Sequence, residues 1–71
     1  MDKVNETTMF TILKSCYEKK RMVTIFAGNW EFEGEILSIF PSLVELRETV
    51  FDHKIYISID SISVVRPWGV N

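Results

Sequence analysis

The sequence is poor in the residues that build covalent, metal-binding or catalytic sites. Cys16 is the only cysteine, so no intrachain disulfide can form, which fits a reducing compartment or a buried thiol. His53 is the only histidine, and no paired cysteine or second histidine stands near it to complete a metal site or activate a nucleophile. There is no glycine-rich phosphate loop either. We therefore expect no enzyme activity, no metal, no cofactor and no small-molecule substrate.

Long apolar runs are also missing. No run approaches the ~18 residues that a membrane-spanning helix needs. Residues 1–8 are polar and carry charges of both signs, unlike the apolar stretch of a secretory signal peptide. Linkers, repeats and low-complexity stretches are absent from the sequence as well. We expect a single domain over residues 1–71 in a soluble, cytoplasmic protein with no membrane partner.

Positive charge is scarce. Lysine and arginine total 8 against 10 aspartates and glutamates, which gives a net charge of −2 and a sequence pI near 5.2. This acidic balance argues against strong non-specific binding to nucleic acid, which depends on neutralisation of phosphates by lysine and arginine. The one dense basic run is Lys19, Lys20 and Arg21. The acidic balance therefore does not exclude a local basic patch.

Apolar residues, in contrast, are plentiful. Hydrophobic residues make up 46% of the chain and aromatic residues 13%. A domain of this length buries only about 60% of the surface that its unfolded chain exposes. Either apolar side chains lie on the surface or another subunit covers them, and we favour the second interpretation.

The apolar periodicity changes once along the chain. Phe10, Leu13 and Tyr17 recur at spacings of three and four, which is typical of an amphipathic helix and predicts one over about residues 8–20. Thr7 or Thr8 can cap it, because a hydroxyl accepts from an unpaired N–H of the first turn. From residue 22 onward the period is two, which is typical of strands.

Turn residues divide this second part into five expected strands, over residues 22–27, 30–39, 43–50, 55–60 and 61–65. Gly28-Asn29 suits a type II′ hairpin turn. Gly34 interrupts the second strand, where we expect a sharp bend or a close backbone approach. The alternation slips by one near Asp60-Ser61, so a bulge or short turn must separate the fourth strand from the fifth.

The predicted fold is mainly β: an N-terminal α-helix followed by a five-stranded, strongly bent antiparallel barrel over about residues 21–66 and a short C-terminal tail. Val44, Leu46 and Val50 are expected to point inward from the third strand. Closing such a sheet into a barrel removes most of its exposed edges.

From Lys14 to Val65 this order and spacing resemble the Sm/LSm family, including the Hfq-type RNA chaperones. The resemblance is carried by an apolar strand, the Gly28-Asn29 turn in place of the family's Asn-Gly, and Gly34 with Phe32 and Ile36 on either side. Sm-like domains form closed rings in which the fourth strand of one subunit pairs with the fifth of the next. The resemblance therefore implies a homo-oligomeric ring of roughly five to seven copies.

The segments that bind RNA in this family differ here. Sm proteins carry an Asp, two residues and Met-Asn, whose Asn contacts a base, where this chain has Phe40-Pro-Ser-Leu-Val44. Sm proteins then carry Arg-Gly, and Hfq-type proteins Tyr-Lys-His, where this chain has Ser58-Ile-Asp-Ser61. Two functions stay open: a ring that binds single-stranded RNA as a chaperone or scaffold, and a structural or protein-interaction ring with no nucleic-acid role.

The expected sites follow from both arguments. Phe40 lies in the loop where the family binds uridine, and its ring can stack on a base or pack at an interface. The other expected RNA contacts are Ser42, Asp60 and Ser61 at the pore, and Lys19, Lys20, Arg21 and Arg47 for phosphate. The basic run also serves as a solubilising helix end that favours the dipole. The expected oligomer interface consists of Ile55, Ile57, Ile59, Ile62 and Val64.

Overall fold

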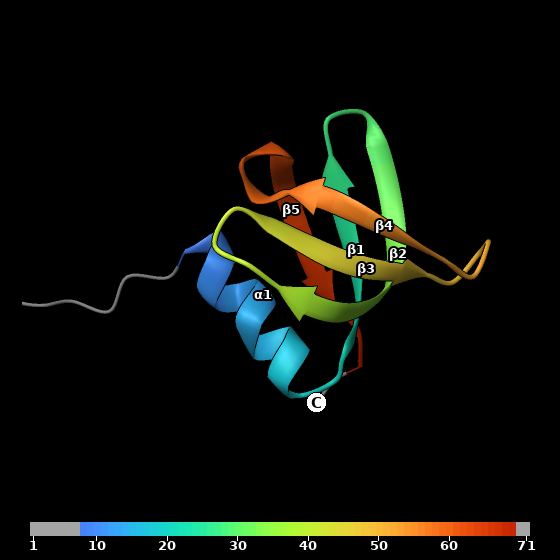
Figure 1. The fold of residues 1–71 in the computed structure, drawn as a ribbon, viewed down its shortest axis with the longest axis horizontal. Helices are drawn as coiled ribbons and strands as arrows, with labels where there is room; N and C mark the ends of the chain where they lie inside the picture. Colours follow the sequence, from blue (N-terminus) through green and yellow to red (C-terminus); the bar gives the residue numbers. More distant parts are fainter. Residues whose placement is uncertain (1–7, 70–71) are drawn as a thin grey trace, which may run out of the picture.

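In a computed structural model the chain forms one helix followed by a five-stranded antiparallel sheet (Figure 1), which confirms the predicted fold class. The structure describes residues 8–69. In chain order the elements are α1 (Met9–Glu18), β1 (Met22–Ala27), β2 (Trp30–Ile39), β3 (Leu43–Glu48), β4 (His53–Ser58), a 3₁₀ helix (Ile59–Ser61) and β5 (Ile62–Pro67).

Helix α1 begins at one of the two predicted caps. The Thr11 N–H donates to the Thr8 hydroxyl oxygen at 3.2 Å, and the Thr8 N–H donates to the Thr11 hydroxyl oxygen at 3.0 Å. This reciprocal capping box satisfies two backbone donors that would otherwise lack partners. The helix then buries Leu13 and Cys16 against the sheet.

Helix α1 ends at Glu18, two residues before the predicted end. Lys20 has a φ of 56°, a left-handed conformation that crowds its Cβ and cannot continue a helix. The Lys20 N–H donates to the Tyr17 carbonyl at 3.2 Å, and the Arg21 N–H donates to the Cys16 carbonyl at 2.9 Å. These two bonds form a Schellman motif with lysine where glycine is usual.

Two glycines act in the sheet as predicted. Gly28 has a φ of 63°, whereas Asn29 is not among the residues with positive φ, which is the sign pattern of a type II′ turn between β1 and β2. At Gly34 of β2 the backbone of β3 lies so close that a Cβ would overlap the carbonyl oxygen of Arg47. The predicted close backbone approach is therefore confirmed.

Irregularities in the register bend the sheet. The pairing of β2 with β3 shifts between Ile36 and Ser38, and that of β1 with β5 shifts between Phe26 and Ala27. Such shifts bend a strand and increase its twist. The slip predicted between the fourth and fifth strands is the 3₁₀ helix Ile59–Ser61.

The sheet is not closed into a barrel, which corrects the prediction. Its order is β4-β3-β2-β1-β5, so within residues 8–69 β4 and β5 each keep one unpaired edge. Antiparallel neighbours alternate in direction, so closure would pair β4 and β5 in parallel. A parallel pair needs a connection of a dozen or more residues, and the three-residue helix Ile59–Ser61 is too short to supply one.

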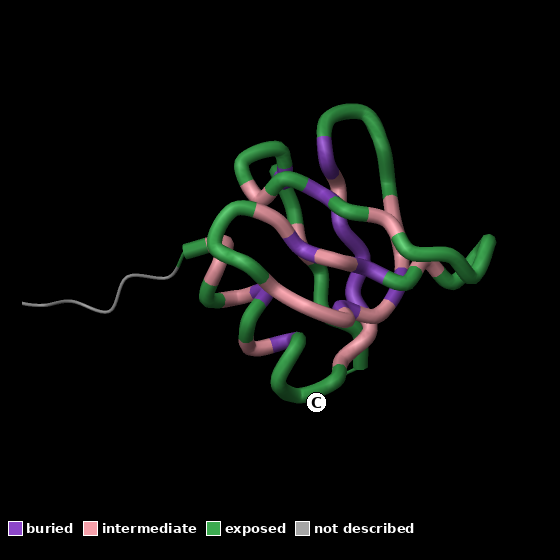
Figure 2. The backbone as a smooth tube through the Cα atoms, viewed as in Figure 1, coloured by how far each residue is buried: buried purple, intermediate pink, exposed green. Residues whose placement is uncertain are grey.

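The core lies between α1 and the concave side of the bent sheet (Figure 2). Its buried residues are Leu13, Cys16, Val23, Ile25, Ala27, Ile36, Val44, Leu46, Ile57 and Ile62. Val44 and Leu46 point inward as predicted. The prediction for Val50 is wrong, because β3 ends at Glu48 and Val50 is 69% exposed in the following turn. In the part of the chain that the structure describes, no helix has the length and apolarity to cross a membrane.

Candidate functional site

Four of the predicted RNA contacts lie together at one end of the sheet (left in Figure 1). Phe40 and Ser42 belong to the β2–β3 loop, and Asp60 and Ser61 belong to the 3₁₀ helix. The two segments are joined by the Ile59 N–H, which donates to the Ser42 carbonyl at 3.0 Å. All four side chains are exposed. This group can stack a base on an aromatic ring and donate from two hydroxyls, while its carboxylate repels phosphate.

The predicted phosphate contacts lie elsewhere. Lys19, Lys20 and Arg21 follow the C-terminal end of α1, at the bottom of Figure 1 and away from the β2–β3 loop. Arg47 is exposed on β3. Its register partners are Glu35 of β2 and Lys54 of β4. The structure therefore separates the eight predicted RNA contacts into three places.

The predicted interface residues differ in how far a second subunit can reach them. Ile57 and Ile62 are 6% and 7% exposed and belong to the core of their own subunit. Ile55 and Ile59 are half-buried and pack against that core. Val64 is 46% exposed. Val64 is thus the member of this group whose side chain is most open to a partner.

The unpaired edge of β4 presents backbone groups to solvent. The Ile59 N–H points toward β3, because it donates to the Ser42 carbonyl. Hydrogen-bonding direction alternates along an extended strand, so the N–H groups of Ser58 and Tyr56 point to the opposite, unpaired side. These groups could not be predicted from the sequence, since they are defined only once the partner of β4 is known.

The unpaired edge of β5 follows from the same alternation. The Trp68 N–H donates to the Met22 carbonyl at 2.9 Å and so points toward β1. The backbone groups of Pro67 and Val65 then point away from β1. Proline has no N–H to leave unpaired, as is usual for proline on an edge strand. Val65 is the residue that offers both a donor and an acceptor there.

Tyr56 is held in place on β4 although it is 62% exposed. Its hydroxyl donates to Glu45 Oε2 at 3.1 Å, and Lys54 Nζ lies 3.7 Å from the same oxygen. The hydrogen bond to Glu45, together with the charge of that carboxylate, raises the pKa of Tyr56. A tyrosine with its ordinary pKa of about 10 is already protonated at neutral pH, so the phenol can donate this hydrogen bond, which orients the ring.

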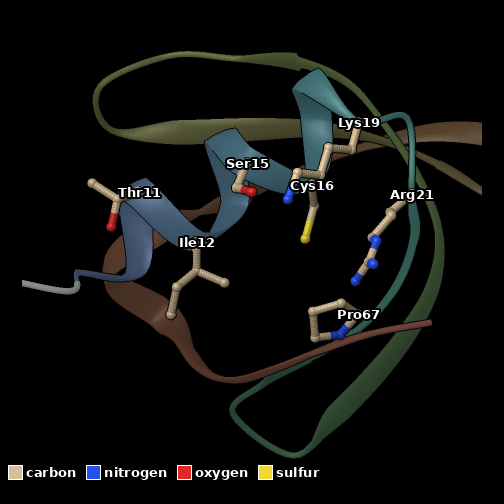
Figure 3. A pocket seen from close by; sticks show the side chains of 7 residues that line it. All are labelled: Thr11, Ile12, Ser15, Cys16, Lys19, Arg21 and Pro67. Atoms are coloured by element: carbon tan, nitrogen blue, oxygen red, sulfur yellow. The ribbon is translucent and has the colours of Figure 1, made fainter. Parts of the chain in front are cut away.

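A pocket of about 260 Å³ lies between α1 and the end of β5 (Figure 3). It is lined by Thr11, Ile12, Ser15, Cys16, Lys19, Arg21 and Pro67. Burial raises the pKa of the Cys16 thiol, and the charges of Arg21 and Lys19 offset part of that rise. A neutral thiol acts as an apolar surface rather than as a nucleophile. The two basic side chains were predictable from the sequence, whereas the pocket was not, because Pro67 is distant from them in sequence.

The β3–β4 hairpin ends in an exposed apolar tip, formed by Val50 and Phe51, each of which is 69% exposed. The tip projects from the rest of the molecule (Figure 1). Phe51 stacks on His53 with ring centroids 5.6 Å apart, and His53 Nε2 lies 3.1 Å from Glu48 Oε1. Asp52 closes the turn with a φ of 55°. The sequence signal for this exposed tip is a pair of adjacent apolar residues beside a turn.

No protein-family model matches this chain, and no curated protein matches its sequence. Among residues 8–69, no group of three or more His, Cys, Asp or Glu side chains is placed to hold a metal ion. Within residues 8–69, the features that can bind another molecule are the sheet edges, the β2–β3 loop, the pocket and the tip.

Proposed function

We propose that this chain is an Sm-like protein that assembles edge to edge into a closed homo-oligomeric ring, of roughly five to seven copies, and that the ring binds single-stranded RNA. The observation that carries this proposal is the pair of unpaired edges, β4 and β5, at the two ends of one sheet. An unpaired edge is a template for pairing with another chain. Pairing β4 of each subunit with β5 of the next occupies both edges when the ring closes.

The free backbone groups favour one register for this pairing. In an antiparallel pair, residues directly opposite each other exchange N–H and C=O bonds when both face the partner strand. Tyr56 and Val65 of the next copy meet this condition. The same register sets Ser58 opposite Ser63, so that the contact runs along nearly the whole length of both strands.

The RNA-binding part of the proposal rests on the group formed by the β2–β3 loop and the 3₁₀ helix. Phe40 is 47% exposed, and base stacking on an aromatic ring tolerates any base sequence. A ring repeats this residue and the Lys19–Arg21 run once per subunit. Repetition raises avidity without any new contact within a subunit.

A second function, a protein-interaction ring without a nucleic-acid role, is supported by charge. The chain carries a net charge of −2, and Asp60 places a carboxylate within the proposed base-binding group. The two functions differ in salt response, because phosphate contacts weaken steeply as salt rises whereas an apolar protein contact does not.

The test is a solution mass by light scattering, followed on the same sample by titration with labelled oligo-U and oligo-A at about 50 and 200 mM salt. We expect a closed oligomer whose RNA affinity falls as salt rises. Phe40→Ala should weaken binding by about tenfold, the size expected for one lost stacking contact, and leave the mass unchanged. Trp30→Ala is the control, since Trp30 is an exposed aromatic on a different hairpin.

The charge contribution is tested by Lys20→Glu combined with Arg21→Glu, which should abolish RNA binding at a protein concentration at which light scattering shows that the variant is still assembled. RNA affinity unchanged in that variant would contradict the phosphate contacts. A closed oligomer that binds neither oligonucleotide would favour the protein-interaction ring. A monomer at all concentrations would contradict both functions.

A further inference from the structure

We propose that the Val50–Phe51 tip of one subunit seats in the pocket between α1 and β5 of the next copy of this chain. This inference rests on the proposed ring. It adds a side-chain contact to the backbone pairing of β4 with β5, and it assigns an occupant to the pocket.

The register of the edges brings tip and pocket together. Positions across an antiparallel pair change in opposite directions, so pairing Tyr56 with Val65 sets His53 opposite Trp68 of the next copy. Phe51 precedes His53 and therefore extends past the C-terminal end of β5. Pro67, at that end, lines the pocket.

The size and lining of the pocket suit an apolar side chain. Its volume of about 260 Å³ is below the roughly 300 Å³ at which small-molecule sites begin. Ile12, Pro67 and the Cys16 thiol supply apolar surface, and sulfur makes favourable contacts with aromatic rings. Phe51, at 69% exposed, has a large apolar area to bury there.

Charge complements the same fit. Asp52 follows Phe51 in the tip, whereas Lys19 and Arg21 line the pocket. Arg21 extends across the pocket toward Pro67 (Figure 3), a position from which a guanidinium can stack on an aromatic ring. Complementary charge fixes the register of such a contact and favours the correct partner.

A cysteine cross-link tests the contact directly. Phe51→Cys places a thiol on the tip, and Cys16 lines the pocket that the tip is proposed to enter. The oxidation is run at alkaline pH, where part of the Cys16 thiol ionises despite its raised pKa. With glutathione disulfide as oxidant, the two thiols lose two protons and two electrons to form one intersubunit disulfide, and two molecules of glutathione are released. Non-reducing electrophoresis should then show a ladder from dimer to the full ring, because each chain forms two links.

Two controls separate this ladder from random oxidation. Trp30→Cys has a matched exposure, since Trp30 is 70% exposed, and should give no product beyond a dimer. Phe51→Cys combined with Cys16→Ser leaves one thiol per chain, so its largest cross-linked product is a dimer. A ladder in the Trp30→Cys protein would overturn the assignment, as would a dimer band as strong with Cys16→Ser present as without it.

A dissociation experiment gives a second measurement without covalent chemistry. Phe51→Ser should raise the concentration at which the ring dissociates by about tenfold or more, as expected for an aromatic that fills a pocket. Trp30→Ser should change it by less than about threefold. Both residues are exposed, so neither change alters the core of the subunit.

The outcomes distinguish this inference from the proposed function. An intact ring without the ladder, whose Phe51→Ser variant dissociates like the wild type, overturns the tip contact and leaves the edge pairing in place. Binding of inorganic phosphate to the pocket in the assembled ring, lost in Arg21→Glu, also overturns it, because the tip would fill that space. A wild-type monomer overturns both proposals.

Discussion

Gly34 shows how a single residue determines the approach of two strands. Because a Cβ would overlap the Arg47 carbonyl oxygen, Gly34→Ala must push β2 and β3 apart. We expect a loss of about 3 kcal/mol in the free energy of unfolding, the size usual for overpacking at a site without room, measured by urea denaturation. Gly28→Ala is the comparison: no atom beyond its chain neighbours lies within 4 Å of its Cβ position, so its loss comes from the positive φ alone and should be about 1 kcal/mol. Equal stability of Gly34→Ala and the wild type would contradict the close approach.

Tyr56 gives a pH dependence at the same scale. Glu45 raises the pKa of Tyr56 by accepting its hydrogen bond and by its charge. A raised pKa means that the contribution to stability is complete below the ordinary tyrosine value of about 10 and is lost as pH rises through the folded value. Glu45→Gln should lower the pKa of Tyr56, as measured by alkaline absorbance titration in a Tyr17→Phe background. An unchanged titration would show that the Glu45 contact is absent in solution.

At the scale of elements, the end of α1 carries strain that a substitution can remove. Lys20 adopts a left-handed conformation at the position of the Schellman motif where glycine is favoured. Lys20→Gly should stabilise the protein by about 1 kcal/mol, because glycine has no Cβ to crowd the following carbonyl. Lys20→Ala is the matched control: it removes the same charge and keeps the Cβ. A Lys20→Gly protein no more stable than Lys20→Ala in thermal unfolding would contradict this account.

The elements were predictable because their signals are local. Thr8 was one of two expected caps, the Gly28-Asn29 turn and the phase slip between β4 and β5 lie where predicted, and the strand order along the chain is correct. Val50 was misplaced because its apolar side chain continues the alternation of β3, although the strand already ends at Glu48. Alternation alone does not distinguish a strand end from a hairpin tip.

Features that depend on the partner of each strand were not predictable from the sequence. The open sheet, the free edges at Tyr56 and Val65, and the pocket beside Pro67 all follow from the order of the strands in the sheet. The candidate base-binding group was found only in part for the same reason. The segments that carry Phe40 and Ser61 are joined by the hydrogen bond from the Ile59 N–H to the Ser42 carbonyl, whereas Arg47 sits apart on β3.

At the scale of the whole molecule, the two outer strands of the sheet, β4 and β5, each have an edge that is free to pair with another chain. Within residues 8–69 the exposed large apolar side chains are Tyr17, Trp30, Phe40, Val50, Phe51, Tyr56, Val64 and Trp68. A ring formed through β4 and β5 would pair both edges and bring a partner to five of them: Val50, Phe51, Tyr56, Val64 and Trp68. This also accounts for the high apolar content of a chain with so small an interior.

The measurement that tests the central claim most directly is the solution mass, by light scattering, of the wild type and two Tyr56 variants. Tyr56→Pro removes an N–H that points to the unpaired side of β4 and leaves the bonds to β3 intact, whereas Tyr56→Thr keeps that N–H and loses the same ring. We predict a closed oligomer for the wild type and Tyr56→Thr, and a folded monomer for Tyr56→Pro. An oligomer of unchanged mass in Tyr56→Pro would contradict assembly through the β4 edge, and a monomeric wild type would contradict the ring itself.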